Sequence, residues 1–167
     1  MNPALLQKGF ILSGCFDYVK SSYKSIVMTA IDFSTRINAP KEKVWGNLWS
    51  DKGYRKWTAA FTEGSYEESS WEEGSTIRFL TPSGEGMFGI IQKKRPFEEM
   101  VFEHQGEIKN GQEEKKEWAG AREGYRLTEV DGITELSVYL DTTEEFINYF
   151  STTFPKALQA VKEISEQ

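Results

Sequence analysis

Apolar and polar residues alternate along residues 29–38, which is the period of a β-strand with one buried face. The positions on the apolar side are Ile31, Phe33, Thr35 and Ile37. Pro40 follows directly, and its fixed φ and missing N–H suit the first turn of a helix. The pattern therefore predicts a strand and then a helix that begins at Pro40, with Asn38 or Ala39 as its cap.

The next apolar positions have the spacing of one helix face. They are Val44, Trp45, Leu48 and Trp49. Residues 50–53 should interrupt this helix and allow a second short helical segment that reaches Trp57. We therefore expect two short helices after the first strand, the first of which packs its tryptophan face against a sheet.

Several β-like segments follow, separated by glycine, proline and charged turns at hairpin spacing. They cover residues 66–71, 75–81, 86–94, 99–106, 118–130 and 133–141. The pair Asp131-Gly132 is the strongest turn signal in the chain. Residues 108–117 are polar and show no strand pattern in their middle. We expect consecutive antiparallel strands that are interrupted by this polar stretch.

Residues 143–166 have the pattern of a long amphipathic helix. Its apolar positions are Phe146, Ile147, Phe150, Phe154, Leu158 and Val161, with either Ala157 or Ile164. Pro155 should bend or divide the helix near residues 151–153, because proline removes a hydrogen bond from a helix interior. No other long amphipathic element can cover a sheet face. The sequence therefore predicts an α+β fold in which an antiparallel sheet of about six or seven strands curves around this helix.

Composition narrows the choice of partners. The chain has 167 residues, enough for one ordinary domain, with 20 basic and 26 acidic residues and a net charge of -6. This sign disfavours binding to nucleic acid or to anionic lipid. Cys15 and His104 are the only residues of their kinds, so no internal disulfide and no Cys/His zinc site can form, and we expect no metal or cofactor. With no apolar run near 20 residues, we expect a cytoplasmic protein without stable membrane association, and a monomer.

The first 27 residues lack a clear period and precede a second methionine, Met28. The run from Leu12 to Cys15 resembles a bacterial lipoprotein cleavage box, but Lys8 interrupts the apolar stretch that such a signal needs. The alternative is a disordered extension, or translation that begins at Met28. We therefore expect residues 1–27 to be an extension and residues 28–167 to form the ligand-binding domain.

Short motifs in a fixed order resemble the START-like, or SRPBCC, superfamily, and most closely the family named for the activator of the heat-shock-protein-90 ATPase. The matching motifs are Ile37-Asn38-Ala39-Pro40 with Val44-Trp45, Glu73-Gly74-Ser75 with Arg78-Phe79, Met100-Val101-Phe102, Thr134 to Val138, and Phe154 to Leu158. The charged segment 110–124 departs from the pattern. The resemblance implies a helix-grip fold whose sheet and C-terminal helix enclose a hydrophobic cavity.

This superfamily includes lipid carriers, hormone binders, polyketide cyclases and co-chaperone domains, so the fold does not fix the function. Our first hypothesis is a non-catalytic domain that binds a small hydrophobic or amphipathic molecule between the sheet and the C-terminal helix. The residues expected to line its cavity are Trp57, Phe61, Phe79, Phe88, Met100, Phe102, His104, Tyr125, Phe150 and Phe154.

Three alternatives stay open at this point. The aromatic residues could simply fill the core. His104, which shares a strand face with Met100 and Phe102, could work with Tyr125 in proton transfer, as in an enzyme of the polyketide cyclase or dehydratase type. The outer surface could instead serve a chaperone-associated interaction.

Overall fold

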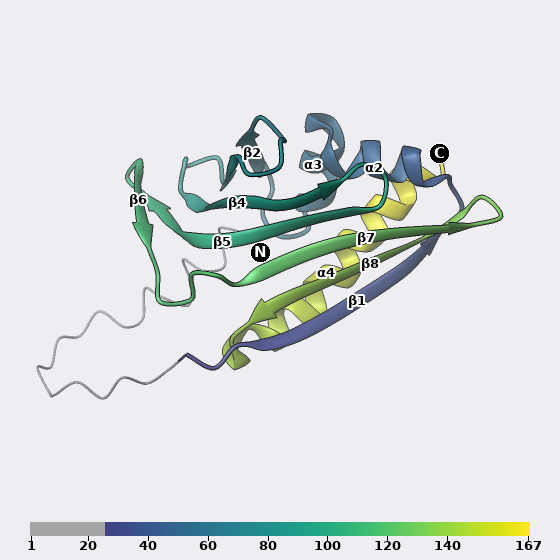
Figure 1. The fold of residues 1–167 in the computed structure, drawn as a ribbon. Helices are drawn as coiled ribbons and strands as arrows, with labels where there is room; N and C mark the ends of the chain where they lie inside the picture. Colours follow the sequence, from purple (N-terminus) through teal and green to yellow (C-terminus); the bar gives the residue numbers. More distant parts are fainter. Residues whose placement is uncertain (1–25) are drawn as a thin grey trace, which may run out of the picture.

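The structure, a computed structural model, describes residues 26–167 (Figure 1). The lipoprotein-like run from Leu12 to Cys15 and residues 1–25 of the expected extension lie outside the described residues. Eight strands form one antiparallel sheet in the order β1-β8-β7-β5-β4-β3-β2, with β6 paired to β5. They are β1 (Thr29–Ile37), β2 (Tyr66–Ser69), β3 (Thr76–Leu80), β4 (Gly86–Arg95), β5 (Glu99–Lys109), β6 (Gln112–Lys115), β7 (Arg122–Val130) and β8 (Ile133–Thr142).

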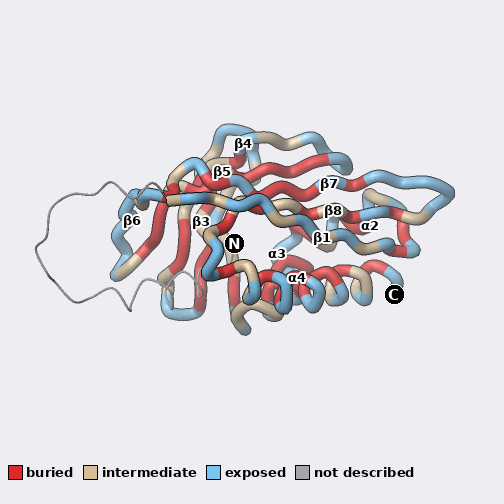
Figure 2. Tube along the Cα trace, turned by 90° about the horizontal axis from the view of Figure 1, so that it is seen from below, coloured by how far each residue is buried: buried red, intermediate tan, exposed pale blue. Residues whose placement is uncertain are grey.

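Three helices complete the described part of the chain, namely α2 (Lys41–Trp49), α3 (Asp51–Thr58) and α4 (Glu144–Ser165). The long helix α4 runs along one face of the curved sheet, while α2 and α3 lie together at one end of it (Figures 1 and 2). The predicted α+β helix-grip architecture, with two short helices after the first strand, is therefore confirmed. The sheet has eight strands, whereas six or seven were expected.

The start of α2 lies one residue later than expected. Pro40 is the N-cap rather than the first helical residue, with φ −66° and ψ 151°, and the helix begins at Lys41. The proline ring still fixes φ, but its ψ is extended, so it turns the chain out of β1 without entering the helix. Ser50 ends this helix and caps α3, since its hydroxyl accepts a hydrogen bond from the Gly53 N–H at 3.2 Å.

Of the two outcomes predicted for Pro155, a bend or a division of the last helix, the division is wrong, because α4 is continuous from Glu144 to Ser165. Proline removes the N–H that would bond to the carbonyl of Ser151, and both residues lie on the exposed side of the helix. Water can therefore solvate the orphaned carbonyl. Phe150 and Phe154 are fully buried on the opposite side and hold the two halves of the helix on the sheet.

The prediction of an irregular stretch at residues 108–117 is also wrong. Strand β5 continues to Lys109 and pairs with β6 through a turn at Asn110 and Gly111, whose φ angles are 51° and 73°. Positive φ at both positions is the geometry that Asn-Gly favours in a two-residue hairpin. All four residues of β6 are exposed, so no apolar alternation marks the strand in the sequence. As a further consequence, β7 begins at Arg122 and not at residue 118.

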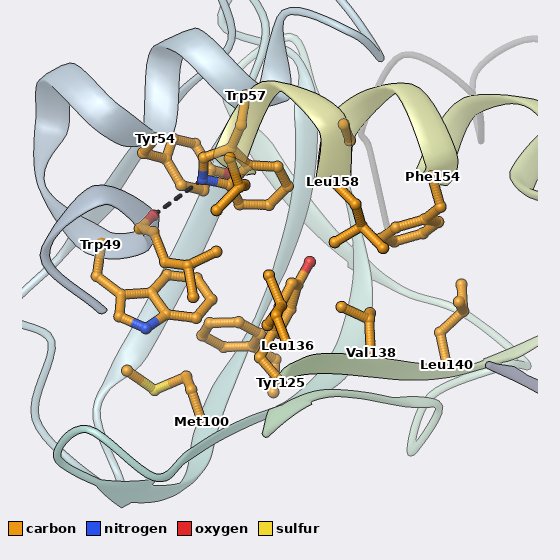
Figure 3. Close-up of a cluster of buried hydrophobic side chains, with 14 of the residues drawn as sticks. Trp49, Tyr54, Trp57, Met100, Tyr125, Leu136, Val138, Leu140, Phe154 and Leu158 are labelled. Carbon is orange, nitrogen blue, oxygen red and sulfur yellow. Dashed lines mark hydrogen bonds between the residues drawn. The ribbon is translucent and has the colours of Figure 1, made fainter. Parts of the chain in front are cut away.

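The core lies between the concave face of the sheet and α4. The ring of Phe154 stacks on Phe33 of β1 with centroids 5.0 Å apart and planes at 15°, and it meets the edge of Phe61 at 5.0 Å. Figure 3 shows Phe154 and Leu158 above side chains of β8. Phe154 is thus the point at which β1, α4 and the segment after α3 pack together.

We predict that Phe154→Ala lowers the free energy of unfolding by about 3 to 5 kcal/mol, because it removes a fully buried ring and leaves a cavity between α4 and β1. Chemical denaturation measures this change. Val130→Ala is the control, since Val130 is 71% exposed and its truncation should change stability by less than about 0.5 kcal/mol. A loss below about 1 kcal/mol for Phe154→Ala would contradict the assigned packing.

Two glycines provide a second test of the fold. A Cβ atom on Gly53 would lie 2.0 Å from the carbonyl oxygen of Asn47, whereas a Cβ on Gly46 would meet nothing within 4 Å. We predict that Gly53→Ala destabilises the protein by forcing α3 away from α2. Gly46→Ala, within α2, should stabilise it by about 0.5 to 1 kcal/mol through a lower entropy cost of helix formation. Thermal unfolding of the two variants should show shifts of opposite sign, and shifts of the same sign would contradict the close approach of α2 and α3.

Candidate functional site

A small cavity lies between α3 and the concave face of β3, β5 and β7. Its lining is made of seven aromatic and three polar side chains. They are Trp49, Tyr54, Trp57, Phe61, Phe79, Phe102 and Tyr125, with Thr58, Ser65 and Glu123. No α4 residue lines it, so the wall opposite the sheet is formed by α3 and the segment that follows α3.

The cavity is largely filled by its own side chains. The free space inside it is about 20 Å³, within a hollow of about 360 Å³ that includes open solvent. Such a space holds about one water molecule. A larger molecule could enter only if a lining side chain moves, and Phe61 is the aromatic member that is only partly buried.

The rings of this cavity hold one another in edge-on contacts. Trp49 meets Tyr125 at 4.9 Å and 88°, and Trp57 at 6.4 Å and 82°. The Trp57 indole N–H also donates a 3.0 Å hydrogen bond to the carbonyl of Leu48, which anchors α3 on the end of α2 (dashed line in Figure 3). Edge-to-face packing of this kind is favoured by the ring quadrupoles.

A chain of polar side chains crosses the concave face next to the cavity. The Tyr125 hydroxyl donates a 2.5 Å hydrogen bond to Oε1 of Glu123, and His104 Nε2 lies 2.9 Å from Oε2 of the same carboxylate. Glu123 and Tyr125 are neighbours on the inner face of β7, while His104 projects from β5. Their exposed fractions are 5%, 2% and 0%. This is the main buried polar cluster at the cavity.

Burial determines the protonation of these groups. Burial lowers the pKa of His104 well below its usual 6.5, even beside a carboxylate, and raises the pKa of Tyr125 well above 10. Both side chains are therefore neutral at physiological pH. A neutral imidazole bonds to a carboxylate only through an N–H, so Nε2 carries the proton and Nδ1 is an acceptor. Nδ1 is buried and has no hydrogen-bond partner among the described residues.

The structure brings half of the expected lining residues together at the cavity, namely Trp57, Phe61, Phe79, Phe102 and Tyr125. Four others are buried in the core but do not line it, namely Met100, His104, Phe150 and Phe154. Phe88 is placed elsewhere, because it is only half-buried and lies on the face of β4 opposite to Met87, which is fully buried. The alternation along β4 turns Phe88 toward the outside, beside Arg78 of β3.

Five lining residues were not predicted from the sequence, namely Trp49, Tyr54, Thr58, Ser65 and Glu123. For Glu123 a signal exists in the sequence. It is two residues from Tyr125, so the two share a strand face, and placing Tyr125 in the cavity places Glu123 there too. Tyr54 and Thr58 likewise lie three residues before and one residue after Trp57 in the second short helix.

Two further properties of the described residues bear on function. No helix within residues 26–167 combines the length and the apolar character needed to cross a membrane. In the same range, no cluster of three or more His, Cys, Asp and Glu side chains is placed to hold a metal ion.

No family model matches the sequence, and no curated protein matches it. Several solved structures resemble it. The Aha1 dimer of Colwellia psychrerythraea aligns with a TM-score of 0.65 and 23% identity over 83% of this chain and 97% of that one. The AHSA1-like protein of Aeromonas hydrophila aligns with a TM-score of 0.61 and 12% identity, over 81% of this chain and 91% of that one. CalU16 of Micromonospora echinospora aligns with a TM-score of 0.61 and 17% identity, over 82% of this chain and 76% of CalU16.

The chain has an Aha1-like fold. The resemblance suggested by the sequence motifs is thereby confirmed at the level of the fold, and at these identities the comparison carries nothing further about function. The Colwellia protein is a dimer in solution, which is a property of that protein. The oligomeric state expected for the present Aha1-like chain stays a prediction.

We predict that the imidazole of His104 stays neutral when the folded protein is acidified. It is the only histidine of the chain, so its NMR signals are unambiguous. Long-range ¹H–¹⁵N spectra should show the Nε2–H tautomer and no titration between about pH 7.5 and 5.5. A midpoint at or above about 6.5 would show instead that His104 and Glu123 form an ion pair.

The lowered pKa of His104 also makes the free energy of unfolding depend on pH. Below about pH 6.5 the unfolded chain takes up the proton that folded His104 does not bind, so the free energy of unfolding falls with decreasing pH. The loss is up to about 1.4 kcal/mol per pH unit until the folded-state pKa is reached. His104→Gln keeps a donor for Glu123 but cannot titrate, so its denaturation curves should show a smaller loss over this window than the wild-type protein.

Proposed function

We propose that the protein binds a small hydrophobic or amphipathic molecule in the cavity between α3 and the sheet. The observation that carries this proposal is the composition of the lining, which combines seven aromatic rings with two hydroxyl groups and a single carboxylate. Small-molecule sites are usually apolar and aromatic with a few convergent polar groups that orient the ligand. The free volume of about 20 Å³ holds about one water molecule, so a ligand of the size of toluene requires a lining side chain to move.

Phe61 is the side chain best placed to admit a ligand. It lies beyond the end of α3, is partly exposed, and packs edge-on against Trp57 and Phe154. Rotation of this one ring would open the cavity without disturbing the hydrogen bond that anchors Trp57. The rest of the aromatic wall can thus remain in place while a ligand enters.

Catalysis by His104 and Tyr125 is the second candidate, and the buried acceptor Nδ1 of His104 is the observation in its favour. However, His104 does not line the cavity, and the Tyr125 proton is already donated to Glu123. A raised pKa also makes the Tyr125 hydroxyl a poor acid. These features support a binding role over proton transfer. A chaperone-associated interaction on the outer surface has no specific feature in its favour.

The test is an NMR titration with toluene and benzyl alcohol. The indole N–H signals of Trp49 and Trp57 report on the cavity, and that of Trp118, outside the lining, is an internal control. We expect saturable shifts of the first two and none of the third. Phe61→Ala should admit the ligands faster and Phe97→Ala, at an exposed site, should change nothing. Unchanged Trp49 and Trp57 signals at millimolar ligand, in wild-type and Phe61→Ala protein alike, would contradict the proposal.

A further inference from the structure

We propose that a second copy of this chain pairs with the open edge of β1, so that the two sheets join into one antiparallel sheet across a two-fold axis. The inference is independent of the cavity and of any ligand, and it replaces the monomer expected from the sequence. Strand β1 is the last strand on one side of the sheet, where it forms the lower border in Figure 1, and among the described residues it pairs with β8 alone. A strand at such an edge offers a row of N–H and C=O groups to a further strand.

Two hydrogen bonds from the end of α4 indicate which backbone groups of β1 point away from β8. Lys162 Nζ donates to the carbonyl of Arg36 at 2.6 Å, and the N–H of Asn38 donates to Oε1 of Glu166 at 2.7 Å. The backbone groups of successive residues in a strand point to opposite sides, so the even-numbered residues of β1 present theirs at the open edge. A carbonyl oxygen has two lone pairs, so the bond from Lys162 leaves Arg36 able to accept a second one.

The middle of this edge is uncovered. Ala30, Asp32 and Ser34 are exposed, and within residues 26–167 their backbone groups make no hydrogen bond on the side away from β8. Ile31 and Phe33, which alternate with them on the inner face, are only half-buried. An added strand would therefore satisfy open backbone groups and cover apolar surface at the same time.

The charges of β1 are complementary to those of a second β1. Asp32 and Arg36 are exposed on the outer face, two residues before and two residues after Ser34, and neither side chain forms an ion pair within the described part of the chain. When two copies pair in antiparallel orientation with Ser34 at the two-fold axis, Asp32 of each copy lies directly opposite Arg36 of the other. Side chains in such positions have Cβ atoms about 5 Å apart, which allows two equivalent ion pairs.

The same charges select this register over its neighbours. An axis at Asp32 would place Asp32 opposite its own copy, and an axis at Arg36 would do the same for the arginine, and like charges directly opposite each other are destabilising. Within one chain Arg36 also lies opposite Glu135 of β8. In the Ser34 register each Arg36 would therefore stand between two carboxylates.

The inner face of the joined sheet would be apolar across the axis. Ile31 would lie opposite the partner's Ile37, and Phe33, whose ring already stacks on Phe154, would lie opposite the partner's Thr35. The paired segment is nevertheless short, and its contact falls below the roughly 1,200 to 2,000 Å² of a stable interface. We therefore expect a weak dimer with a Kd on the order of 10 to 100 µM.

The first test uses the full wild-type chain at neutral pH. Sedimentation velocity from about 5 to about 500 µM protein should show conversion of monomer to dimer. Hydrogen exchange at the two ends of this range should show protection of the Asp32 and Ser34 amides that rises with concentration. A monomer at all concentrations would overturn the proposal. Protection that does not depend on concentration would overturn it too, because it would show that another part of the same chain covers the edge.

Charge reversal tests the pairing and its register. Asp32→Arg and Arg36→Asp, each alone, put like charges opposite each other at both places and should weaken self-association at least about ten-fold. The first variant has arginine at both positions and the second has aspartate at both, so an equimolar mixture of the two should form a heterodimer. The double variant Asp32→Arg/Arg36→Asp should dimerise as the wild type does.

Glu72→Arg is the matched control. It makes the same change of charge at an exposed carboxylate between β2 and β3, at the opposite edge of the sheet, and should leave the Kd within about two-fold of wild type. Self-association of the single variants with wild-type strength, or a mixture that forms no heterodimer, would overturn pairing through β1 in this register. Formation of the heterodimer would also show that both single variants are folded.

Discussion

The packing of the apolar side of α4 against the concave sheet is the interaction on which the other parts of the structure depend. This helix packs along β1 and lies above inner side chains of β8 (Figure 3), so without it these side chains would lose their main cover. The helix also fixes what lies beyond the sheet. Asn47 of α2 donates to Ser165 at 3.0 Å, and Lys162 donates to the carbonyl of Arg36 at 2.6 Å, so the end of α4 joins α2 and β1.

The cavity follows from this arrangement by a short chain of contacts. Helix α2 is held by α4, and α3 is held close to α2 because Gly53 has no side chain to collide with the Asn47 carbonyl. Trp57 then reaches back to the Leu48 carbonyl and forms one wall. Phe61 spans the distance from Trp57 to Phe154 of α4. The cavity is thus the space that remains between α3, the end of α2 and the sheet, and α4 fixes the positions of these elements through its contacts with α2 and Phe61.

The sequence predicts the elements that carry a strong local signal and misses those fixed by tertiary contacts. The Asp131-Gly132 turn has positive φ at both residues, as its composition predicts, and β7 and β8 pair around it. The turn at Asn110-Gly111 was not predicted, although its composition is of the same kind, because the exposed strand that follows it has no hydrophobic period. The division predicted at Pro155 does not occur for the opposite reason, because the burial of Phe154 and Ala157 on either side of the proline outweighs its local cost.

In the candidate site, too, local patterns in the sequence predict some features and tertiary contacts determine the others. Strand parity places Tyr125 and Phe102 correctly on the inner face, because alternation along a strand is a local rule. The volume left between the rings depends on how side chains from separate elements interdigitate, and no pattern in the sequence encodes it. Phe88 is an example. A ring in a predicted strand can lie on either face of the sheet, and the pairing of β4 with β3 shows which face Phe88 occupies.

Glu123 is a carboxylate that is buried on the inner face of the sheet. Burying a carboxylate costs stability unless charge or hydrogen bonds compensate it. Glu99 is a comparable buried carboxylate, and it contacts Lys93 and Arg126, which lowers its pKa and ties strands together at the outer face. Glu123 is on the inner face, where its carboxylate accepts a hydrogen bond from the Tyr125 hydroxyl and lies within hydrogen-bond distance of His104. Glu123 thus links β7 to β5 through His104, beside the cavity that its side chain helps to line.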